Sequence, residues 1–299
     1  MKLDTHNDYA ARMLRVLNHM QRHLDAPLNI ERLASIAHFS TSHFHRVFKG
    51  MLGETIMDHV RRIRLERAYI ELVRTDVPVT DIAFDAGYES LEAFSRSFRK
   101  TFGLSPSQCR EQQHWSRRFP AAPSAVHYCG GEIVEILFDE TGAAHMNVRI
   151  ENLPDLRILK VRQTGPYMES ATRAWGMLCA WAGPKGLFGP QTMSIGISHD
   201  DPQVTRPEDI RYDAAITAPP EVAPEAPIEA DTLPGGKYAV ITHQGPYEKL
   251  EDAYAQIMGQ WLPASNHEYR DTPWFEVYRN DPANTPPEQL ITDIHIPLK

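Results

Sequence analysis

Apolar residues at helical spacing divide the first 112 residues into short amphipathic helices. Residues 10–24 carry one apolar stripe, and a second short helix follows Asn29, whose side chain suits a helix N-cap. The next helix has one apolar face and one polar face. The apolar residues are Phe44, Val47, Phe48 and Met51, and the polar residues are Ser42, His45, Arg46 and Lys49.

The same two-helix pattern returns at an offset of 50 residues. The corresponding residues are Phe44 and Phe94, Arg46 and Arg96, Phe48 and Phe98, and Gly53 and Gly103. Two short helices joined by a tight turn, the second with a basic outer face, are typical of a helix-turn-helix. Residues 54–74 are predicted to form one helix of about 30 Å between the two pairs. This length suits adjacent major grooves, which lie roughly 34 Å apart.

The second half of the chain alternates strand-like runs with helical runs. Residues 158–167 recur as residues 238–247 at an offset of 80, and both copies end in Gly-Pro-Tyr. Each copy predicts a strand, a helix and two further strands, so we expect a duplicated α+β module with a ligand cleft at its pseudo-twofold junction. Residues 132–138 and 146–152 are predicted as two more strands around a turn at 139–142.

These patterns predict a multidomain chain. An all-α tandem helix-turn-helix domain is expected over residues 8–112, a linker over 113–125, and the duplicated α+β domain over 126–299. The linker is expected because periodicity is lost there and prolines accumulate, at Pro120 and Pro123. A length of 299 residues suits two or three domains.

Charge is divided unevenly along the chain, whose net charge is −8. Residues 1–120 contain 18 Lys and Arg against 14 Asp and Glu, whereas residues 121–299 contain 13 against 25. The first part can therefore approach phosphate, and the second would be repelled by it. No run approaches the ~20 apolar residues of a membrane span, and the three cysteines are too dispersed for a paired metal site. We expect a cytoplasmic protein with no cofactor, metal or membrane partner.

The stretch from Val77 to Arg110 resembles the signature of AraC/XylS-family transcription regulators in its D-I-A-x-x-x-G-Y, F-S-R-x-F-R and G-x-S-P-S-x-x-R runs. The resemblance implies base readout by Ser42, His45 and Arg46 in the first pair and by Glu92, Ala93 and Arg96 in the second. Further candidate DNA contacts are Lys49, Ser95 and Arg99, and Arg61, Arg62, Arg64 and Arg67 on the long helix are candidates for phosphate. A single polar residue of this kind more often belongs to a solvated helix face. The position of these residues opposite the phenylalanines, however, favours a role in contacting DNA.

Residues 147–299 resemble the GyrI-like, or effector-binding, domain found behind AraC-type helices. The resemblance rests on both Gly-Pro-Tyr motifs and on the closing run FEVYRNDPANTPPEQLITDIHIPL. It implies an aromatic, often cationic, small molecule bound between the two modules, beside a central glutamate. In this chain that residue would be Glu276.

Glu276 lies in a predicted strand between two large aromatic residues. Trp274, Glu276 and Tyr278 would point to one side of that strand, and Phe275 and Val277 to the other. A carboxylate between aromatic rings would neutralise a lipophilic cation and offer it cation–π faces. Candidate walls of such a pocket are Tyr167, Trp181, Tyr212 and Tyr247. The alternatives are a wet sheet face with Glu276 at the surface, and plain core packing for the tryptophans.

The sequence therefore predicts a transcription regulator and not an enzyme. It would bind double-stranded promoter DNA, contact RNA polymerase and sense a small aromatic or cationic molecule. A single chain with two recognition helices could bind DNA as a monomer. Two alternatives remain, a GyrI-like hydrolase of reactive cyclic toxins with Glu276 as general base, and a protein-interaction module.

Arg46→Ala and Arg96→Ala should each weaken specific DNA binding by about 1–3 kcal/mol, because each arginine is predicted to pair with one base edge. Each variant should relax the base preference at one position, and the two positions should lie in different half-sites. Binding to randomised duplexes, together with footprinting, measures both effects. Loss of contacts at the same base pair in both variants would contradict the two-groove model.

Overall fold

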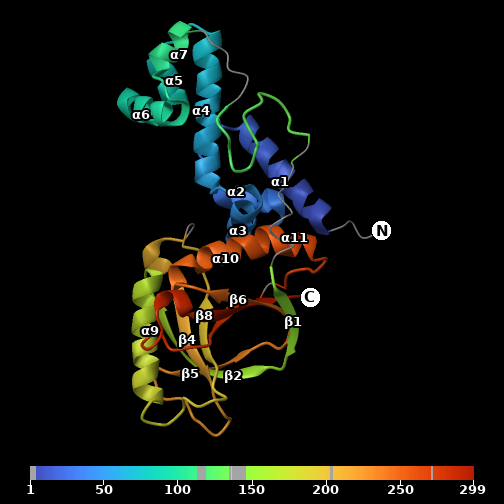
Figure 1. Cartoon of the computed structure of the whole chain (residues 1–299), viewed down its shortest axis with the longest axis vertical. Coiled ribbons are helices and arrows are strands. Elements are labelled where there is room, and N and C mark those ends of the chain that lie inside the picture. The colour runs from blue at the N-terminus through green and yellow to red at the C-terminus, as the bar shows by residue number, and fades with distance from the viewer. Residues whose placement is uncertain (1–4, 113–118, 135, 137–145, 203–204, 271) are drawn as a thin grey trace. The chain divides into compact units, whose positions relative to one another are not determined.

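The computed structural model describes residues 5–112, 119–134, 136, 146–202, 205–270 and 272–299. The chain forms two compact units, Met1–Asp139 and Glu140–Lys299. Helices build the first unit, and an antiparallel sheet with covering helices builds the second (Figure 1). The predicted order of an all-α and then an α+β domain is confirmed. Among the described helices, none combines the length and the apolar character that crossing a membrane requires.

The first unit contains both predicted helix-turn-helix pairs. Its helices are α1 (Thr5–Arg22), α2 (Ile30–Ala37), α3 (Thr41–Leu52), α4 (Ile56–Arg74), α5 (Val79–Asp85), α6 (Leu91–Phe102) and α7 (Pro106–Gln112). The first pair, α2 with α3, and the second pair, α5 with α6, lie near opposite ends of α4 (Figure 1). The 19 residues of α4 span about 28 Å at roughly 1.5 Å per residue. The predicted single helix between the two pairs is confirmed as α4.

Local backbone geometry repeats with the sequence. Gly53 and Gly103 end α3 and α6 in the left-handed region, with φ of 69° and 78°, a conformation that glycine adopts at little cost. The turn within each pair also has a positive φ, 54° at His38 in the first pair and 82° at Gly87 in the second. A Cβ at position 87 would lie 2.7 Å from Nη1 of Arg64, so a side chain here would displace that guanidinium in addition to straining the backbone.

Each helix pair packs its phenylalanines against a different part of α4. Phe44 and Phe48 of α3 are fully buried, and the Phe48 ring lies edge-on to His59 of α4 with ring centroids 5.6 Å apart. In the second pair, Phe98 of α6 stacks on Tyr69 of α4 with centroids 6.1 Å apart. Burial of each such ring contributes about 1.5–3 kcal/mol. Both cores therefore depend on α4.

The second unit is an eight-stranded sheet with helices. Its strands are β1 (Val148–Leu153), β2 (Leu156–Thr164), β3 (Ser194–Ser198), β4 (Arg211–Thr217), β5 (Glu229–Leu233), β6 (Gly236–Gln244), β7 (Phe275–Tyr278) and β8 (Ile291–Pro297). Its helices are α9 (Tyr167–Ala182), α10 (Leu250–Gln256), the π-helical turn Ile257–Trp261 and α11 (Leu262–Ala264). Short 3₁₀ turns occur at Pro207–Asp209, Tyr247–Lys249 and Pro287–Gln289.

The strand order shows that the duplicated module is larger than predicted. Each repeat begins with an additional strand, β1 or β5, and these strands are exchanged between repeats, since β1 pairs with β6 and β5 pairs with β2. The order β1-β6-β8-β7-β3-β4-β2-β5 is therefore palindromic about the β3–β7 pair. At that pair Gly196 lies opposite Glu276, its own counterpart at the offset of 80. The sequence did not indicate β5, because the first four residues of this edge strand are exposed.

The two faces of the sheet hold separate cores. One face buries Tyr238, Phe275 and Val277 together. The other face is covered by α9, whose Leu178 packs with Leu159 and other sheet residues. Side chains that alternate along a strand are thereby sorted into two different environments.

Two predictions for residues 113–138 are wrong. Residues 119–134, which we call the connector, belong to the first unit, although residues 113–125 were predicted as a linker and 126–299 as one domain; residues 113–118 lie outside the described residues. The strand predicted over 132–138 is not formed at 132–134 or 136, and its other positions and the turn at 139–142 also lie outside. The later strand, predicted over 146–152, is confirmed as β1.

Buried amide and carboxylate side chains hold the connector on α1 and α4. Asn18 donates from Nδ2 to the carbonyl of Ile133 at 2.9 Å and accepts from the same residue's N–H at 2.7 Å. Gln21 donates from Nε2 to a connector carbonyl at 2.9 Å, and Glu66 accepts the N–H of Tyr128 at 2.8 Å. These side chains form hydrogen bonds with the connector backbone that, in a sheet, a neighbouring strand would form.

A fragment of residues 1–134 should be markedly more stable than a fragment of residues 1–118. The shorter fragment leaves Asn18, Gln21 and Glu66 without their connector partners, and each buried group left unsatisfied costs about 1–3 kcal/mol. Urea unfolding followed by circular dichroism measures the difference in the free energy of unfolding. Equal stability of the two fragments would show that the connector is not part of the first unit.

Candidate functional site

The second recognition helix presents the polar face that its pattern predicts. Glu92, Arg96 and Arg99 are exposed, and Ala93 and Ser95 are half-buried. The phenylalanines of α6 are buried on the opposite side. A helix with one such face can enter a major groove, where an arginine pairs with guanine and a carboxylate accepts from cytosine.

The predicted contacts on α3 are less accessible. Arg46 and Lys49 are half-buried, and His45 is 5% exposed. Ser42 lies within α3, but its side chain falls outside the described part of the structure.

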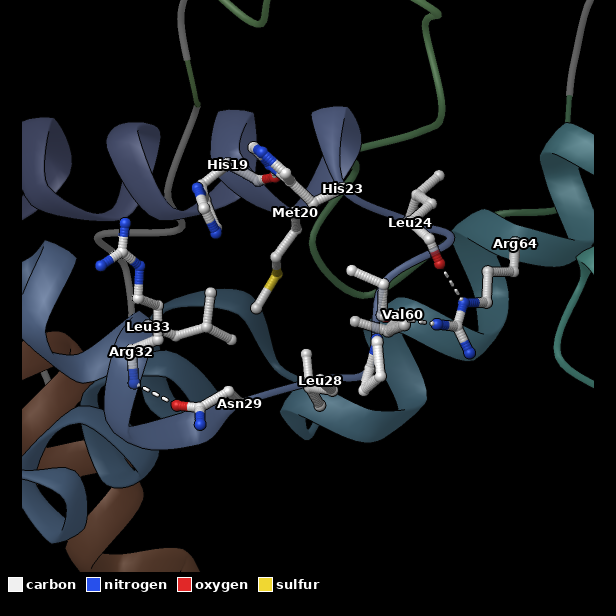
Figure 2. A pocket seen from close by; sticks show the side chains of 12 residues that line it. His19, Met20, His23, Leu24, Leu28, Asn29, Arg32, Leu33, Val60 and Arg64 are labelled. Atoms are coloured by element: carbon white, nitrogen blue, oxygen red, sulfur yellow. Dashed lines mark hydrogen bonds between the residues drawn. The ribbon is translucent and has the colours of Figure 1, made fainter.

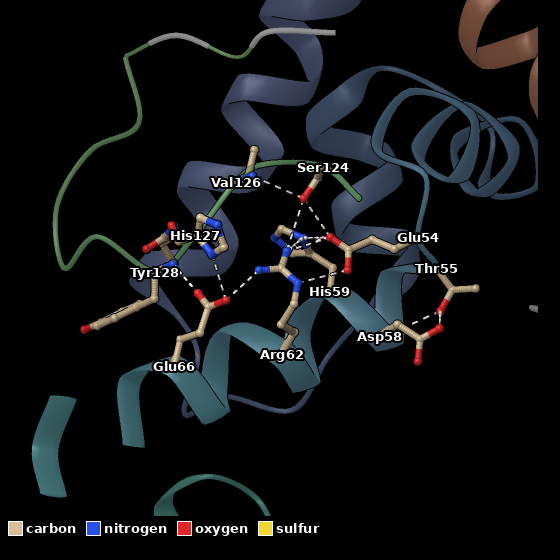
Figure 3. Close-up of polar contacts among 11 residues, drawn as sticks. Glu54, Thr55, Asp58, His59, Arg62, Glu66, Ser124, Val126, His127 and Tyr128 are labelled. Carbon is tan, nitrogen blue, oxygen red and sulfur yellow. Dashed lines mark hydrogen bonds and ion pairs between the residues drawn. The ribbon is translucent and has the colours of Figure 1, made fainter. Parts of the chain in front are cut away.

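Arg62 does not have the role predicted for it as a phosphate contact. Its side chain is 15% exposed, and it donates to Glu54 Oε1 at 2.6 Å and to Glu66 Oε1 at 2.8 Å (Figure 3). Both carboxylates are buried, and breaking such a pair typically costs about 3–5 kcal/mol. A phosphate would have to compete with these two ion pairs. Arg62 therefore acts inside the protein.

Two further arginines of α4 are also engaged within the first unit. Nε of Arg64 donates to the carbonyl of Leu24 at 2.9 Å, at the edge of a hollow that α1, α2 and α4 line together (Figure 2). The guanidinium of Arg67 lies 2.7 Å from the Asp25 carboxylate. Arg61 also pairs with a carboxylate, that of Asp58, but both side chains lie at the surface and Arg61 is 63% exposed. It is thus better placed than Arg62 to meet phosphate along this helix.

Glu276 of β7 is a buried carboxylate held by tyrosines. It is 5% exposed, and the hydroxyls of Tyr254 on α10 and Tyr278 on β7 donate to its two oxygens, both at 2.5 Å. The Tyr278 hydroxyl lies 3.0 Å from the hydroxyl of Tyr212 on β4, which accepts from Nε1 of Trp175 on α9 at 3.0 Å. A chain of hydrogen bonds therefore links α9, β4, β7 and α10.

More aromatic rings surround this chain. Ring centroids are 5.3 Å apart for Tyr247 and Tyr278, 5.2 Å for Tyr254 and Trp274, and 6.2 Å for Tyr167 and Tyr212. We call Glu276 and these aromatic residues the Glu276 cluster: Tyr167, Trp175, Tyr212, Tyr247, Tyr254, Trp274 and Tyr278. Phe275 and Val277 lie in the core on the other face of the sheet. The predicted alternation of side chains along this strand is confirmed.

Gly196 leaves the space in which the tyrosine hydroxyls meet. It pairs with Glu276 across the pseudo-twofold axis. A Cβ at this position would lie 2.3 Å from the hydroxyl of Tyr278 and 2.6 Å from that of Tyr212, distances that real atoms do not adopt. The absence of a side chain here is therefore a condition for the hydrogen-bond chain.

Three tyrosines of the Glu276 cluster, Tyr278, Tyr212 and Tyr247, remain protonated at neutral pH. Burial raises the pKa of Tyr278, Tyr212 and Tyr247, and the charge of Glu276 raises each of them further. Their hydroxyls therefore donate hydrogen bonds and do not act as bases.

Trp181 lies outside the Glu276 cluster. Its Nε1 donates to Glu225 at 3.2 Å, and the Lys185 ammonium lies 5.3 Å from its ring centroid. The ring also packs against the core beneath α9. The predicted pocket wall at Trp181 is therefore not formed, and the alternative of core packing describes this residue better.

Sequence reasoning missed Trp175, Tyr254 and Gly196. Trp175 and Tyr254 follow Tyr167 and Tyr247, the tyrosines of the two Gly-Pro-Tyr motifs, by about two helical turns. That spacing could have indicated two aromatic residues directed to one site. Gly196 could have been found as the repeat counterpart of Glu276.

Comparison with known proteins agrees with this arrangement. Residues 146–299 match the model of the GyrI-like small-molecule-binding domain, and residues 33–112 match a helix-turn-helix domain model. The transcriptional regulator Rob of Salmonella typhimurium is 26% identical over 258 residues, which cover 83% of each chain. The right origin-binding protein of Escherichia coli is 25% identical over 94% of this chain and 95% of its own length.

The first unit has a further relative of higher identity. The regulatory protein SoxS of Escherichia coli is 39% identical over 93 residues, which cover 31% of this chain and 87% of SoxS. Together, the paired helix-turn-helix units and the duplicated sheet match known regulators over both parts of the chain. The chain belongs to the AraC/XylS family of DNA-binding transcription regulators, and it carries a C-terminal GyrI-like small-molecule-binding domain.

Proposed function

We propose that the protein regulates promoters in response to an aromatic organic cation that binds at the Glu276 cluster. The observation that carries this proposal is a buried carboxylate among aromatic rings, at the axis of a domain whose family binds small molecules. The predicted cleft at the junction of the repeats would then be formed by these side chains as the ligand enters. Family membership supports the regulatory role.

The DNA-binding part of the proposal rests on the two helix pairs. α3 and α6 would enter successive major grooves, with Arg46 and Arg96 as the principal base contacts. Because one chain supplies both recognition helices, it would bind a two-part site as a monomer. We further propose that it acts in the cytoplasm and contacts RNA polymerase when bound to a promoter.

The ligand-binding part rests on electrostatics within the Glu276 cluster. A cation near Glu276 gains charge neutralisation in a poorly solvated place, and each well-placed aromatic face adds about 0.5–2 kcal/mol. Because Glu276 is 5% exposed, the side chains over it must move when a ligand binds. The binding energy is thereby coupled to the arrangement of α9 and α10, which a regulatory response needs.

We assign Glu276 a binding role and not that of a general base. Both of its oxygens accept hydrogen bonds from hydroxyls, and Tyr278 and Tyr247 have raised pKa values that keep them protonated. Neither group is thus poised to activate a water molecule. A stabilising ligand that is recovered unchanged supports sensing, whereas turnover would support the hydrolase alternative.

Glu276→Gln should lower the affinity for a cation far more than for a neutral molecule of the same shape. The test pair is an aryl trimethylammonium ion and the corresponding neutral tert-butyl arene, titrated calorimetrically. The cation should bind about ten- to a hundredfold more weakly, since it loses a charge pair of some 1.4–2.8 kcal/mol, and the neutral arene less than about twofold. Glu225→Gln, which changes the carboxylate beside Trp181, is the matched control and should change neither affinity.

Equal losses for both molecules in Glu276→Gln would mean that this residue only shapes the site. If the wild-type protein binds the cation and Glu276→Gln loses affinity for neither molecule, the ligand binds elsewhere.

Gly196→Ala should disrupt the Glu276 cluster without adding any charge. The new Cβ would overlap the hydroxyls of Tyr212 and Tyr278, so we expect a loss of about 1–3 kcal/mol in the free energy of unfolding and weaker binding of the aryl trimethylammonium ion. Gly176→Ala is the control, because Gly176 lies within α9 with open space around it. That change should preserve or slightly raise stability. Similar stability of both variants in urea unfolding would contradict the close packing at Gly196.

A further inference from the structure

The connector contacts both helix pairs of the first unit. At its start, the ring of Phe119 lies edge-on to Tyr69 of α4 with centroids 6.0 Å apart, and 6.3 Å from the ring of Phe102 at the end of α6. Tyr69 belongs to the core of the second pair. The connector thus begins on the second pair, at the end of its recognition helix.

Its middle lies against the end of the first recognition helix. Pro123 packs on Gly53, the residue that ends α3, and a Cβ added at Gly53 would lie 3.1 Å from the Pro123 Cβ. Ser124 then donates from Oγ to Glu54 Oε1 at 2.8 Å. The connector can lie close to this turn because Gly53 has no side chain, and the buried Glu54 carboxylate binds the next connector residue.

Two acidic side chains lock the middle of the connector onto α4 (Figure 3). Glu66 contacts Nδ1 of His127 at 2.9 Å through one oxygen and accepts the N–H of Tyr128 at 2.8 Å through the other. Arg62 joins Glu66 to Glu54. Hydrogen bonds to buried charges are directional, and leaving one unmade costs more than a neutral bond would. This part of the connector therefore has one well-defined position on α4.

The end of the connector is fixed on α1. Asn18 forms two hydrogen bonds with the backbone of Ile133, and α1 packs on α2 of the first pair. The connector thus crosses from the core of the second pair to the helix that supports the first pair. α4 alone would allow each pair to pivot about its end of the helix, whereas a second link restricts that movement.

We infer that the connector fixes the separation and angle of the two recognition helices, and so determines which half-site spacing the protein accepts. This inference rests on the proposed binding of DNA through both helix pairs. One base pair added between half-sites shifts them by about 3.4 Å and rotates them by roughly 35°. A braced pair of recognition helices cannot follow both changes, but a pair joined only by α4 can adapt in part.

The test uses the full chain and a binding site obtained by selection from random duplexes with the wild-type protein. Its spacing is then changed by one base pair in either direction. The wild-type protein should bind the altered sites about tenfold or more weakly, a loss comparable with one mismatched base pair. Phe119→Ala and Asn18→Ala should each reduce this discrimination to about twofold or less, with a smaller loss on the selected site itself.

Val134→Ala is the matched control, because Val134 lies in the connector but is 86% exposed. It should keep the spacing preference of the wild-type protein. Circular dichroism establishes that each variant is folded. If Phe119→Ala does not fold, Phe119→Leu keeps an apolar side chain without the aromatic contacts, and Asn18→Ala tests the other end.

The possible results separate the two proposals. Selection that yields no two-part site would overturn both the DNA-binding model and the role of the connector. A two-part site whose spacing preference is unchanged in folded Phe119→Ala or Phe119→Leu and in Asn18→Ala would overturn the role of the connector alone. Loss of affinity by the same factor at every spacing would also overturn it, because the connector would then only stabilise the fold.

Discussion

Arg62 lies between two buried carboxylates, and the packing of the first unit depends on this pairing. Burial alone would raise the pKa of Glu54, but hydrogen bonds from His59 and Arg62 outweigh it and lower the pKa to about 2. The carboxylate is therefore ionised at neutral pH, and removing its cation would leave a costly buried charge. The same guanidinium binds Glu66, whose other oxygen takes the connector backbone. One ion-pair network thus positions α4 and the connector. It also engages Arg62, which was predicted to contact phosphate.

The second unit also contains a buried carboxylate, that of Glu276 at its pseudo-twofold axis. Exact duplication would place identical residues opposite each other at the β3–β7 pair, so a glutamate in both repeats would bring two carboxylates together, and one would have to be neutralised. Instead Gly196 faces Glu276, and the space above the glycine admits the hydroxyls of Tyr212 and Tyr278. The departure from symmetry therefore creates the hydrogen-bonded Glu276 cluster, while the symmetric part of the module builds the sheet.

Local periodicity predicted the residues whose burial depends only on the face they occupy. Phe94 and Phe98 were placed correctly by spacing along one helix, and Glu276 by alternation along one strand. Partners that are distant in the chain could not be predicted in this way, since they depend on tertiary packing. Ser124 meets a carboxylate 70 residues away, and Trp181 meets Glu225, which lies 44 residues further along the chain.

Because the two repeats exchange their first strands, the first described strand after the connector lies in the same half of the sheet as Glu276. β1 is the first described strand after the connector, yet it pairs with β6, and the ladder continues through β8 to β7. Glu276 thus lies in the same run of strands as β1, while β2, the next strand in the chain, lies in the other half of the sheet. A ligand changes DNA affinity only if it binds two states of the protein with different free energies. A cation bound at Glu276, as proposed, would supply such a difference, because it would compete with the hydroxyls of Tyr254 and Tyr278 for one carboxylate and alter the bonds that join α10 to β7.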